Sequence, residues 1–378
     1  MRHAKQESAQ QRRTIPLMTP FLQRVVRFLR ENPEGVQIVR RVSTEDTIEP
    51  PEEEGGFSRA MLVHEPDRRE FGVFPVPPAD EPTQFTHFID GIQHSHLLYY
   101  QQTAKGLLPV VYGYVAAMVL ERRDRALHPA SDLTESEEAL YLPLKAFDER
   151  KFNRAGVEVH DSLEERELEK TSFSTMLVRA GATVARVRDQ LERKLALQWI
   201  KQQTPASNDW LLVDGSIADL MSALEQRRLV QVVGVSKSHR TSYLEVNWML
   251  QVFNMPAGYR SSVFRPVREG QSEVYSWYLR LRWQAGASPT YGLVRVETPV
   301  LTSPDDTREW ADKISAWLLQ ETRPLSLPDP RYDRLLYPFR LCEQHLRSRA
   351  PSDAVMRTAT ERVGDLSAAA PEPAPAAN

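Results

Sequence analysis

Two apolar segments in the second half of the chain are separated by a segment with a helical pattern. Residues 210–214 (WLLVD) and 229–236 (LVQVVGVS) are apolar on both faces, which is typical of strands buried within a parallel sheet. Residues 217–228, which lie between them, have the apolar spacing of a helix. The order strand, helix, strand predicts two parallel strands joined by a crossover helix.

The remaining apolar patterns predict strands and helices on both sides of this unit. Strand patterns lie at residues 84–90, 110–120, 140–144, 274–283 and 291–298. Helical patterns lie at residues 20–30, 175–201, 305–319 and 332–347. Together they predict an α/β fold in which a mixed β-sheet is flanked by helices.

The two ends of the chain differ in composition from its middle. Residues 1–56 are predicted to form an N-terminal helical extension and an acidic linker, because residues 47–56 read TIEPPEEEGG. Residues 57–348 form the main domain, and the Ala/Pro-rich residues 349–378 form a disordered tail. The amphipathic helix at residues 20–30 either packs on the body of the protein or docks on a partner.

Composition and missing motifs exclude several classes of protein. The chain has 48 basic and 51 acidic residues, so any contact with nucleic acid must come from local basic patches. The single cysteine, Cys342, excludes an intrachain disulfide and a cysteine-cluster zinc site. No P-loop and no G-x-S-x-G motif is present. Neither a signal peptide nor a bilayer-spanning apolar segment is visible, which predicts a cytoplasmic protein without a membrane contact.

Two aspartates stand where a predicted strand ends and a glycine follows, Asp90 before Gly91 and Asp214 before Gly215. Glycine permits a sharp turn and the close approach of a ligand to the backbone. Carboxylates gathered at strand ends repel one another unless a cation neutralises them, and Mg²⁺ or Mn²⁺ prefers such oxygen ligands. The pattern therefore indicates a divalent-metal site that is suited to phosphodiester cleavage.

Seven short motifs follow one another in order around these aspartates. They are FIDGIQHS at 88–95, DQLERKLAL at 189–197, WLLVDGSI at 210–217, VVGVSKS at 232–238, SWYLRL at 276–281, LVRVETP at 293–299 and YPFRLCEQHL at 337–346. In these motifs the chain resembles the NurA nuclease family across residues 81–348. The resemblance implies an RNase H-like fold and a metal-dependent 5′-to-3′ DNA exonuclease that works in DNA end resection and repair, with single-strand endonuclease activity as a further option. It also implies a homodimer and a HerA-type hexameric ATPase, a DNA translocase, as partner.

The resemblance also implies which residues hold the metal. Asp90 and Asp214 correspond to the family's strand aspartates, and Glu192 corresponds to its helix glutamate. Glu121, at the end of the second predicted strand, is the alternative third carboxylate. His345 corresponds to a histidine in the last helix, which can ligate the metal or donate a proton to a leaving oxygen.

Further candidates lie on the predicted strands and just after them. Lys237 follows a buried strand, where it either contacts the scissile phosphate or is solvated in a loop. Tyr291 is our candidate for the family's active-site tyrosine, with Tyr278 as the alternative. Glu297 either ligates the metal or pairs with an arginine such as Arg295.

Substrate contacts and competing functions stay open at this point. The candidate phosphate contacts are Arg122, Arg123, Arg125, Arg186, Arg188, Lys237 and Arg240. Residues 126–170 are charge-rich and match no motif of the family. The competing functions are a catalytically silent RNase H-like adaptor that docks DNA, and another metal-dependent phosphoesterase that acts on RNA or nucleotides.

Overall fold

The computed structural model describes most of the chain. The described residues are 18–37, 58–63, 65, 70–124, 126–164, 167, 170–204, 207–239, 241–267, 273–300, 306–322 and 336–368. The predicted acidic linker at 47–56, the start of the predicted helix at 332–347, and Arg125 and Arg240 lie outside the described residues.

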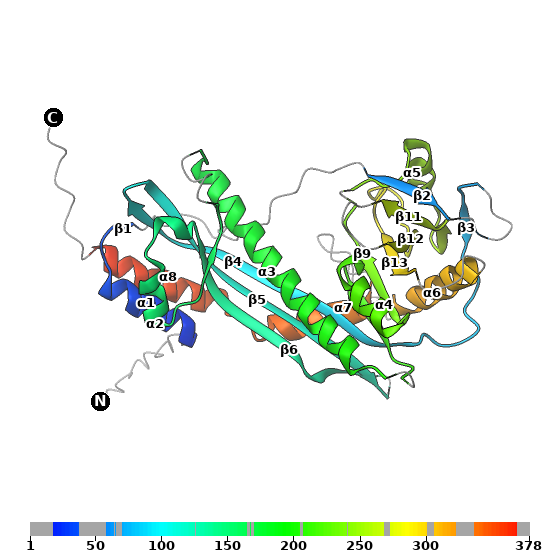
Figure 1. Ribbon diagram of the computed structural model, residues 1–378, viewed down its shortest axis with the longest axis horizontal. Coiled ribbons are helices and arrows are strands. Elements are labelled where there is room, and N and C mark those ends of the chain that lie inside the picture. Colours follow the sequence, from blue (N-terminus) through cyan, green and yellow to red (C-terminus); the bar gives the residue numbers. More distant parts are fainter. Residues whose placement is uncertain are drawn as a thin grey trace, which may run out of the picture.

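The described chain forms both strands and helices, and several strands follow one another without a helix between them (Figure 1). The strands are β1 (Val36–Gln37), β2 (Arg59–Leu62), β3 (Val73–Pro75), β4 (Phe85–Thr103), β5 (Gly106–Arg123), β6 (Ala126–Leu142), β7 (Val159–Asp161), β8 (Trp210–Asp214), β9 (Val232–Ser236), β10 (Tyr259–Ser261), β11 (Phe264–Val267), β12 (Val274–Arg280) and β13 (Leu293–Pro299). The helices are α1 (Pro20–Glu31), α2 (Glu149–Ala155), α3 (Phe173–Gln202), α4 (Met221–Arg227), α5 (Val246–Phe253), α6 (Thr307–Glu321), α7 (Tyr337–Arg347) and α8 (Asp353–Ala368).

The central part of the sheet has the strand order β6-β5-β4-β8-β9. Strands β4, β5 and β6 are antiparallel neighbours, whereas β8 lies parallel to β4 and β9 lies parallel to β8. Helix α3 connects the antiparallel part to β8, and α4 connects β8 to β9. This arrangement is RNase H-like, so the predicted fold class of a mixed sheet flanked by helices is confirmed.

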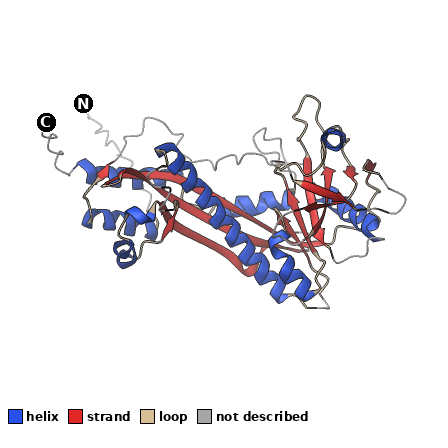
Figure 2. Ribbon diagram, turned by 45° about the horizontal axis from the view of Figure 1, so that its top comes forward, coloured by secondary structure: helices blue, strands red, loops and turns tan. Residues whose placement is uncertain are grey.

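The antiparallel strands are much longer than their sequence patterns predict. Figure 2 shows β4, β5 and β6 as long strands with α3 laid across them, while β9 to β13 gather at one end of the molecule. The prediction that the first strand ends at Asp90 is wrong, because β4 continues to Thr103 with Gly91 in its interior. The short strand predicted at 140–144 is the end of β6, which begins at Ala126.

Side chains of the central strands alternate between two buried faces. Phe88 and Leu212 belong to the core that includes α6 and α7, whereas Ile89 and Val213 belong to the core that includes α3 and α4. The alternation follows from the two-residue period of a strand. Residues on one strand therefore reach both helical layers, and Asp90, two residues after Phe88, is on the face of α7.

The N-terminal helix packs on the body of the protein. Thr19 caps α1, since its side chain accepts a hydrogen bond from the backbone N–H of Leu22, and Pro20 occupies the first turn, where no intrahelical donor is needed. The apolar side of α1, from Phe21 to Leu29, is buried in the same core as Tyr112. The first of the two interpretations of this helix therefore holds for its apolar face.

The predicted disordered tail begins too early in the sequence. Residues 353–368 form α8, which packs against α1 and buries Met356, Ala359 and Val363. These three residues have helical spacing, so one apolar face stabilises the helix although alanine and charged residues dominate its composition. The Ala/Pro-rich residues 369–378 lie outside the described residues.

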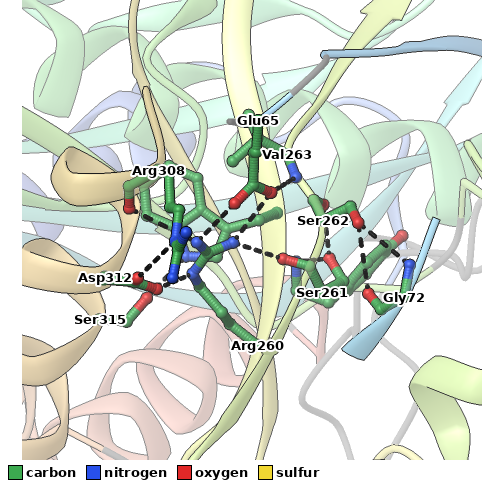
Figure 3. Close-up of polar contacts among 11 residues, drawn as sticks. Glu65, Gly72, Arg260, Ser261, Ser262, Val263, Arg308, Asp312 and Ser315 are labelled. Atoms are coloured by element: carbon green, nitrogen blue, oxygen red, sulfur yellow. Dashed lines mark hydrogen bonds and ion pairs between the residues drawn. The ribbon is translucent and has the colours of Figure 1, made fainter. Parts of the chain in front are cut away.

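A buried ion network connects β10 to α6 at the end of the molecule that carries β9 to β13 (Figure 3). The Arg260 side chain is fully buried, and its guanidinium donates to both carboxylate oxygens of Glu65, at 3.1 and 2.7 Å. It also donates to Asp312 of α6. Every charge in this network has a partner of opposite sign, which is the condition under which buried charges are tolerated.

Candidate active site

Asp90 and Asp214 lie side by side on two neighbouring parallel strands. The register pairs Ile89 of β4 with Val213 of β8, so the two aspartates follow the last paired residues at the same level of the sheet. Asp90 is buried, with 5% of its surface exposed. Its Oδ1 accepts a hydrogen bond from the Gly91 N–H, but its buried Oδ2 has no hydrogen-bond partner.

Glu192 of α3 reaches the same strand through Gly91. A Cβ atom added to Gly91 would overlap Oε1 of Glu192 and would lie 3.0 Å from the Ala116 carbonyl oxygen. Glycine is therefore required here for a close approach of side chain to strand rather than for a turn. Glu192 also pairs with Arg188 one helical turn earlier, at 3.3 Å.

Glu121, the alternative third carboxylate, lies elsewhere. It is opposite His87 in the ladder of β4 and β5, whereas Asp90 is opposite Met118. Its carboxylate pairs with Arg123, and this hydrogen bond lowers the pKa of Glu121. Of the two candidates, Glu192 is the one that lies against Gly91, next to Asp90 in the chain, and its charge contributes to the raised pKa of Asp90.

Lys237 joins the aspartates from the next strand. It follows β9, the parallel neighbour of β8, and its Nζ lies 2.8 Å from Oδ2 of Asp214. The same ammonium group is 5.2 Å from the ring centroid of Phe339 on α7. Lys237 is therefore part of the carboxylate site rather than a solvated loop lysine, although a third of its side chain stays exposed.

The site has more negative charge than its cations neutralise. Burial, and then the charge of Asp214, raise the pKa of Asp90 well above the ordinary value for aspartate, while Lys237 opposes the shift. Burial also raises the pKa of Glu192 to about 8, against the opposing charge of Arg188. Burial disfavours the charge of Lys237, but Asp214 and Asp90 outweigh this effect and raise its pKa.

Helix α7 contributes Glu343 to this field, a residue that we did not single out within the sequence motifs. Its charge adds to the increase in the pKa of both Asp90 and Lys237. Glu343 lies one turn after Phe339 and directly after Cys342, both buried on α7. That helical spacing is the signal that could have identified it, because it places Glu343 next to the face that packs on the sheet.

His345, the predicted histidine of the site, lies two residues further along α7. Burial and the charge of Arg349 lower its pKa, and none of the site carboxylates contributes to the shift. Its Nε2 is buried without a hydrogen-bond partner. Two residues correspond to about 200° around a helix, so His345 and Glu343 face different directions.

The two candidate tyrosines do not contact the carboxylates among the described hydrogen bonds. Tyr278 is buried on β12, where it stacks on Phe264, and burial raises its pKa to about 12. Tyr291 precedes β13, and its backbone carbonyl accepts a hydrogen bond from Arg280. The structure therefore gives neither phenol a contact with Asp90 or Asp214.

Glu297 has a clear structural partner set. Its carboxylate pairs with Arg295 and accepts hydrogen bonds from the Ser216 hydroxyl, at 2.6 Å, and from the Ile217 N–H, at 3.0 Å. Of the two interpretations, pairing with an arginine is the one observed. Because Ser216 lies two residues after Asp214, Glu297 stabilises the turn that follows this candidate metal ligand.

The described residues include no group of three or more His, Cys, Asp and Glu side chains already spaced to hold a metal ion. Lys237 and Arg188 contact the carboxylates of Asp214 and Glu192 instead. The donor set nevertheless fits a hard divalent ion, because carboxylates from three elements lie near enough to raise one another's pKa and Oδ2 of Asp90 is buried without a partner. Asp90, Asp214 and Glu192 are the residues that could hold such an ion.

A cavity of about 830 Å³ lies beside the site. Gln93 of β4, Arg186 and Arg188 of α3, and Ser238 are among its lining residues, and Ser238 directly follows Lys237. Arg186 is exposed and makes no ion pair among the described contacts, whereas Arg188 pairs with Glu192 and Asp189. Of the cavity's arginines, Arg186 is therefore the better placed for a substrate phosphate.

Two other arginines that the sequence suggested for DNA contact are engaged within the protein. Arg122 forms a two-pronged pair with the buried Glu321 of α6, at 2.8 and 2.6 Å, and also donates to the Phe85 carbonyl. Arg123 pairs with Glu121. Arg122 thus connects β5 to α6, and its guanidinium has little remaining capacity for a phosphate.

The chain resembles a known protein in its structure rather than in its sequence. No protein-family model matches the chain, and no curated protein matches it. The structure is similar to that of the NurA nuclease from Sulfolobus solfataricus, with a TM-score of 0.42 and 12% sequence identity, over 78% of this chain and 86% of that one.

Within the described part of the chain, no helix is long and apolar enough to cross a membrane.

Proposed function

We propose that this protein is a divalent-metal-dependent nuclease that hydrolyses DNA phosphodiester bonds at the site of Asp90, Asp214 and Glu192. The observation that supports it is that these three carboxylates, from two parallel strands and one helix, share one electrostatic field in which a buried aspartate oxygen has no partner. Such an assembly is electrostatically unfavourable by itself. It becomes favourable when a divalent cation binds, and Mn²⁺ or Mg²⁺ suits these ligands.

Each residue has a role that follows from its position. Asp90, Asp214 and Glu192 would hold the ion, which when bound activates water and stabilises charge on the phosphate. Lys237 lies close enough to Asp214 to neutralise a phosphate that such an ion would hold there. Glu343 adds negative charge from α7, and we keep His345 and Tyr291 as weaker candidates for proton transfer because neither contacts the carboxylates.

The direct test is incubation with end-labelled single- and double-stranded DNA in Mn²⁺, Mg²⁺ or EDTA. We expect cleavage with either metal and none with EDTA. The product pattern distinguishes exonuclease from endonuclease activity and gives strand polarity. Binding of DNA without cleavage in any metal would instead support the silent adaptor, and cleavage restricted to RNA or nucleotides would support the broader phosphoesterase.

We expect Arg186→Ala to weaken the binding of single-stranded DNA and to lower its salt dependence. Arg186 lies six residues before Glu192, or about 9 Å along the axis of α3, so it can contact a phosphate near the cleaved bond. Loss of one phosphate contact lowers the slope of log affinity against log salt by about 0.7. Fluorescence anisotropy over a salt series in EDTA measures this slope.

The matched control is Arg193→Ala, because Arg193 is exposed on the same helix but does not line the cavity. This variant should keep the affinity and the slope of the wild type. Equal slopes for all three proteins would exclude the cavity as a phosphate-binding site.

The proposal includes a HerA-type hexameric translocase, because the chain has no P-loop with which to separate strands itself, and a homodimer, which the resemblance to the NurA family implies. Removing residues 1–46 would be a poor test of docking, since it deletes the buried face of α1 as well.

The exposed face of α1 carries Arg27 and Arg30. We expect charge reversal of both arginines to glutamate to weaken co-purification of such a translocase while DNA cleavage is unchanged. Unchanged co-purification would move the docking surface away from α1, and light scattering on the same samples tests the homodimer.

A further inference from the structure

We propose that Lys237 and a divalent cation compete for the carboxylate of Asp214, and that Lys237, once it leaves Asp214, contacts a substrate phosphate. This inference rests on the proposed nuclease function and adds to it a residue that sets metal affinity. The contact that carries it is the 2.8 Å ion pair between Nζ of Lys237 and Oδ2 of Asp214. An ammonium group at this distance occupies the oxygen that a metal ion would need.

The charges of the site make this competition unavoidable. Asp90, Asp214, Glu192 and Glu343 all contribute to one electrostatic field, in which Lys237 contacts Asp214, Arg188 contacts Glu192 and Arg347 contacts Glu343. With all groups charged, the four carboxylates exceed these three cations by one charge. A divalent cation would more than balance that excess, and the Lys237 ammonium would repel it strongly at short range.

Lys237, rather than Arg188, is the cation that can leave. Arg188 is held by two carboxylates of its own helix, Asp189 and Glu192. Lys237 contacts Asp214 alone among the described ion pairs, its side chain is one-third exposed, and it has a flexible four-carbon stem. The ring of Phe339, 5.2 Å from Nζ, already contacts the ammonium group and would still attract it after Asp214 is released.

The release of Lys237 would give one residue two successive tasks. In the metal-free protein it reduces the repulsion between Asp214 and Asp90, which are adjacent on β8 and β4. After release, its charge remains beside the same carboxylates, where a phosphate bound through the metal would lie. Lys237 should therefore not remain in contact with Asp214 while a phosphate is bound.

The test is the affinity for Mn²⁺, measured by isothermal titration calorimetry at pH 7 without DNA. Lys237→Met removes the competing charge and keeps the apolar stem, so we expect Mn²⁺ to bind about tenfold more tightly than to the wild type. Lys237→Arg should bind Mn²⁺ more weakly than the wild type, because a guanidinium holds a carboxylate through two hydrogen bonds. Unchanged or weaker binding by Lys237→Met would overturn the inference.

A double-mutant cycle separates competition at Asp214 from general repulsion. Asp214→Asn should weaken Mn²⁺ binding, and Lys237→Met should then no longer strengthen it. A tenfold gain that persists in the Asp214→Asn background would show that the lysine acts at a distance and would overturn the competition. Circular dichroism checks folding, and Lys237→Gln replaces Lys237→Met if the latter does not fold.

The same titrations distinguish this inference from the proposed function. A wild-type protein that binds no Mn²⁺, and that still binds none after Lys237→Met, would refute the metal site itself. A wild-type protein that binds Mn²⁺ with an affinity insensitive to residue 237 would leave the metal site standing and refute the role of Lys237.

Discussion

Asp90→Asn is expected to abolish DNA cleavage and, in metal-free buffer at pH 8, to raise the free energy of unfolding. The pKa of Asp90 is raised in the folded protein, mainly by burial and by Asp214. Between the unfolded and folded pKa values the folded chain therefore holds a proton that the unfolded chain has lost, and stability falls as the pH rises. Asparagine keeps the Oδ1 acceptor for the Gly91 N–H but carries no charge. The variant therefore does not lose stability in this way as the pH rises.

Each unit by which the folded protein raises the pKa of Asp90 would contribute about 1.4 kcal/mol to this gain in stability. Urea unfolding at pH 5 and pH 8 in EDTA measures it, and the gain over the wild type should be larger at pH 8. Asp219→Asn, on the exposed turn after β8, is the matched control and should change neither activity nor stability. Full cleavage activity in Asp90→Asn would remove Asp90 from the site.

Arg260→Met is expected to lower the free energy of unfolding by about 3–5 kcal/mol, the cost of removing one partner of a buried ion pair. The guanidinium is fully buried and neutralises both Glu65 and Asp312 (Figure 3). Methionine fills much of the volume but leaves both carboxylates without their cation. Chemical denaturation at pH 7 measures the change, and thermal unfolding should begin at a lower temperature.

The control for Arg260 is Arg265→Met, which removes an ion pair of the same type from the surface. The Arg265 and Glu273 side chains are 32% and 63% exposed, so this change should cost less than about 1 kcal/mol. Replacing Glu65 by glutamine in the Arg260→Met background should recover part of the loss, because one unpaired buried charge is removed. Equal stabilities of Arg260→Met and Arg265→Met would show that the buried network does not stabilise the fold.

Local apolar periodicity in the sequence predicted most of the elements and the fold class. Strand β8 has the predicted bounds, and α1 and α3 begin or end within two residues of theirs. These segments are long or uniformly apolar, so short-range pattern alone identifies them. The same reasoning failed for β6, which carries half-buried glutamates and whose strand character depends on pairing with β5.

The positions of glycines predicted the structure less well than the apolar periodicity did. Gly91 predicted a turn after Asp90, but the residue lies inside β4 and provides space for Glu192 of α3. A glycine in a strand has two uses, a turn or a close approach, and only the position of the neighbouring helix distinguishes them. The tail was misjudged for a similar reason, since α8 is stabilised by its contact with α1.

The sequence by itself determined which residue types are available for chemistry: two aspartates in apolar strands, a glutamate on a long helix and a lysine after a buried strand. Tertiary structure alone decided which of them meet. The parallel register of β4 and β8 brings Asp90 beside Asp214, and the neighbouring strand β9 brings Lys237 to it. Glu343 lies on α7, more than 100 residues after Asp214 in the chain, so no short-range pattern could predict its place near the site. The physical reason is that apolar periodicity reports which face of an element is buried, whereas the meeting of charges depends on strand register and helix packing across the whole fold.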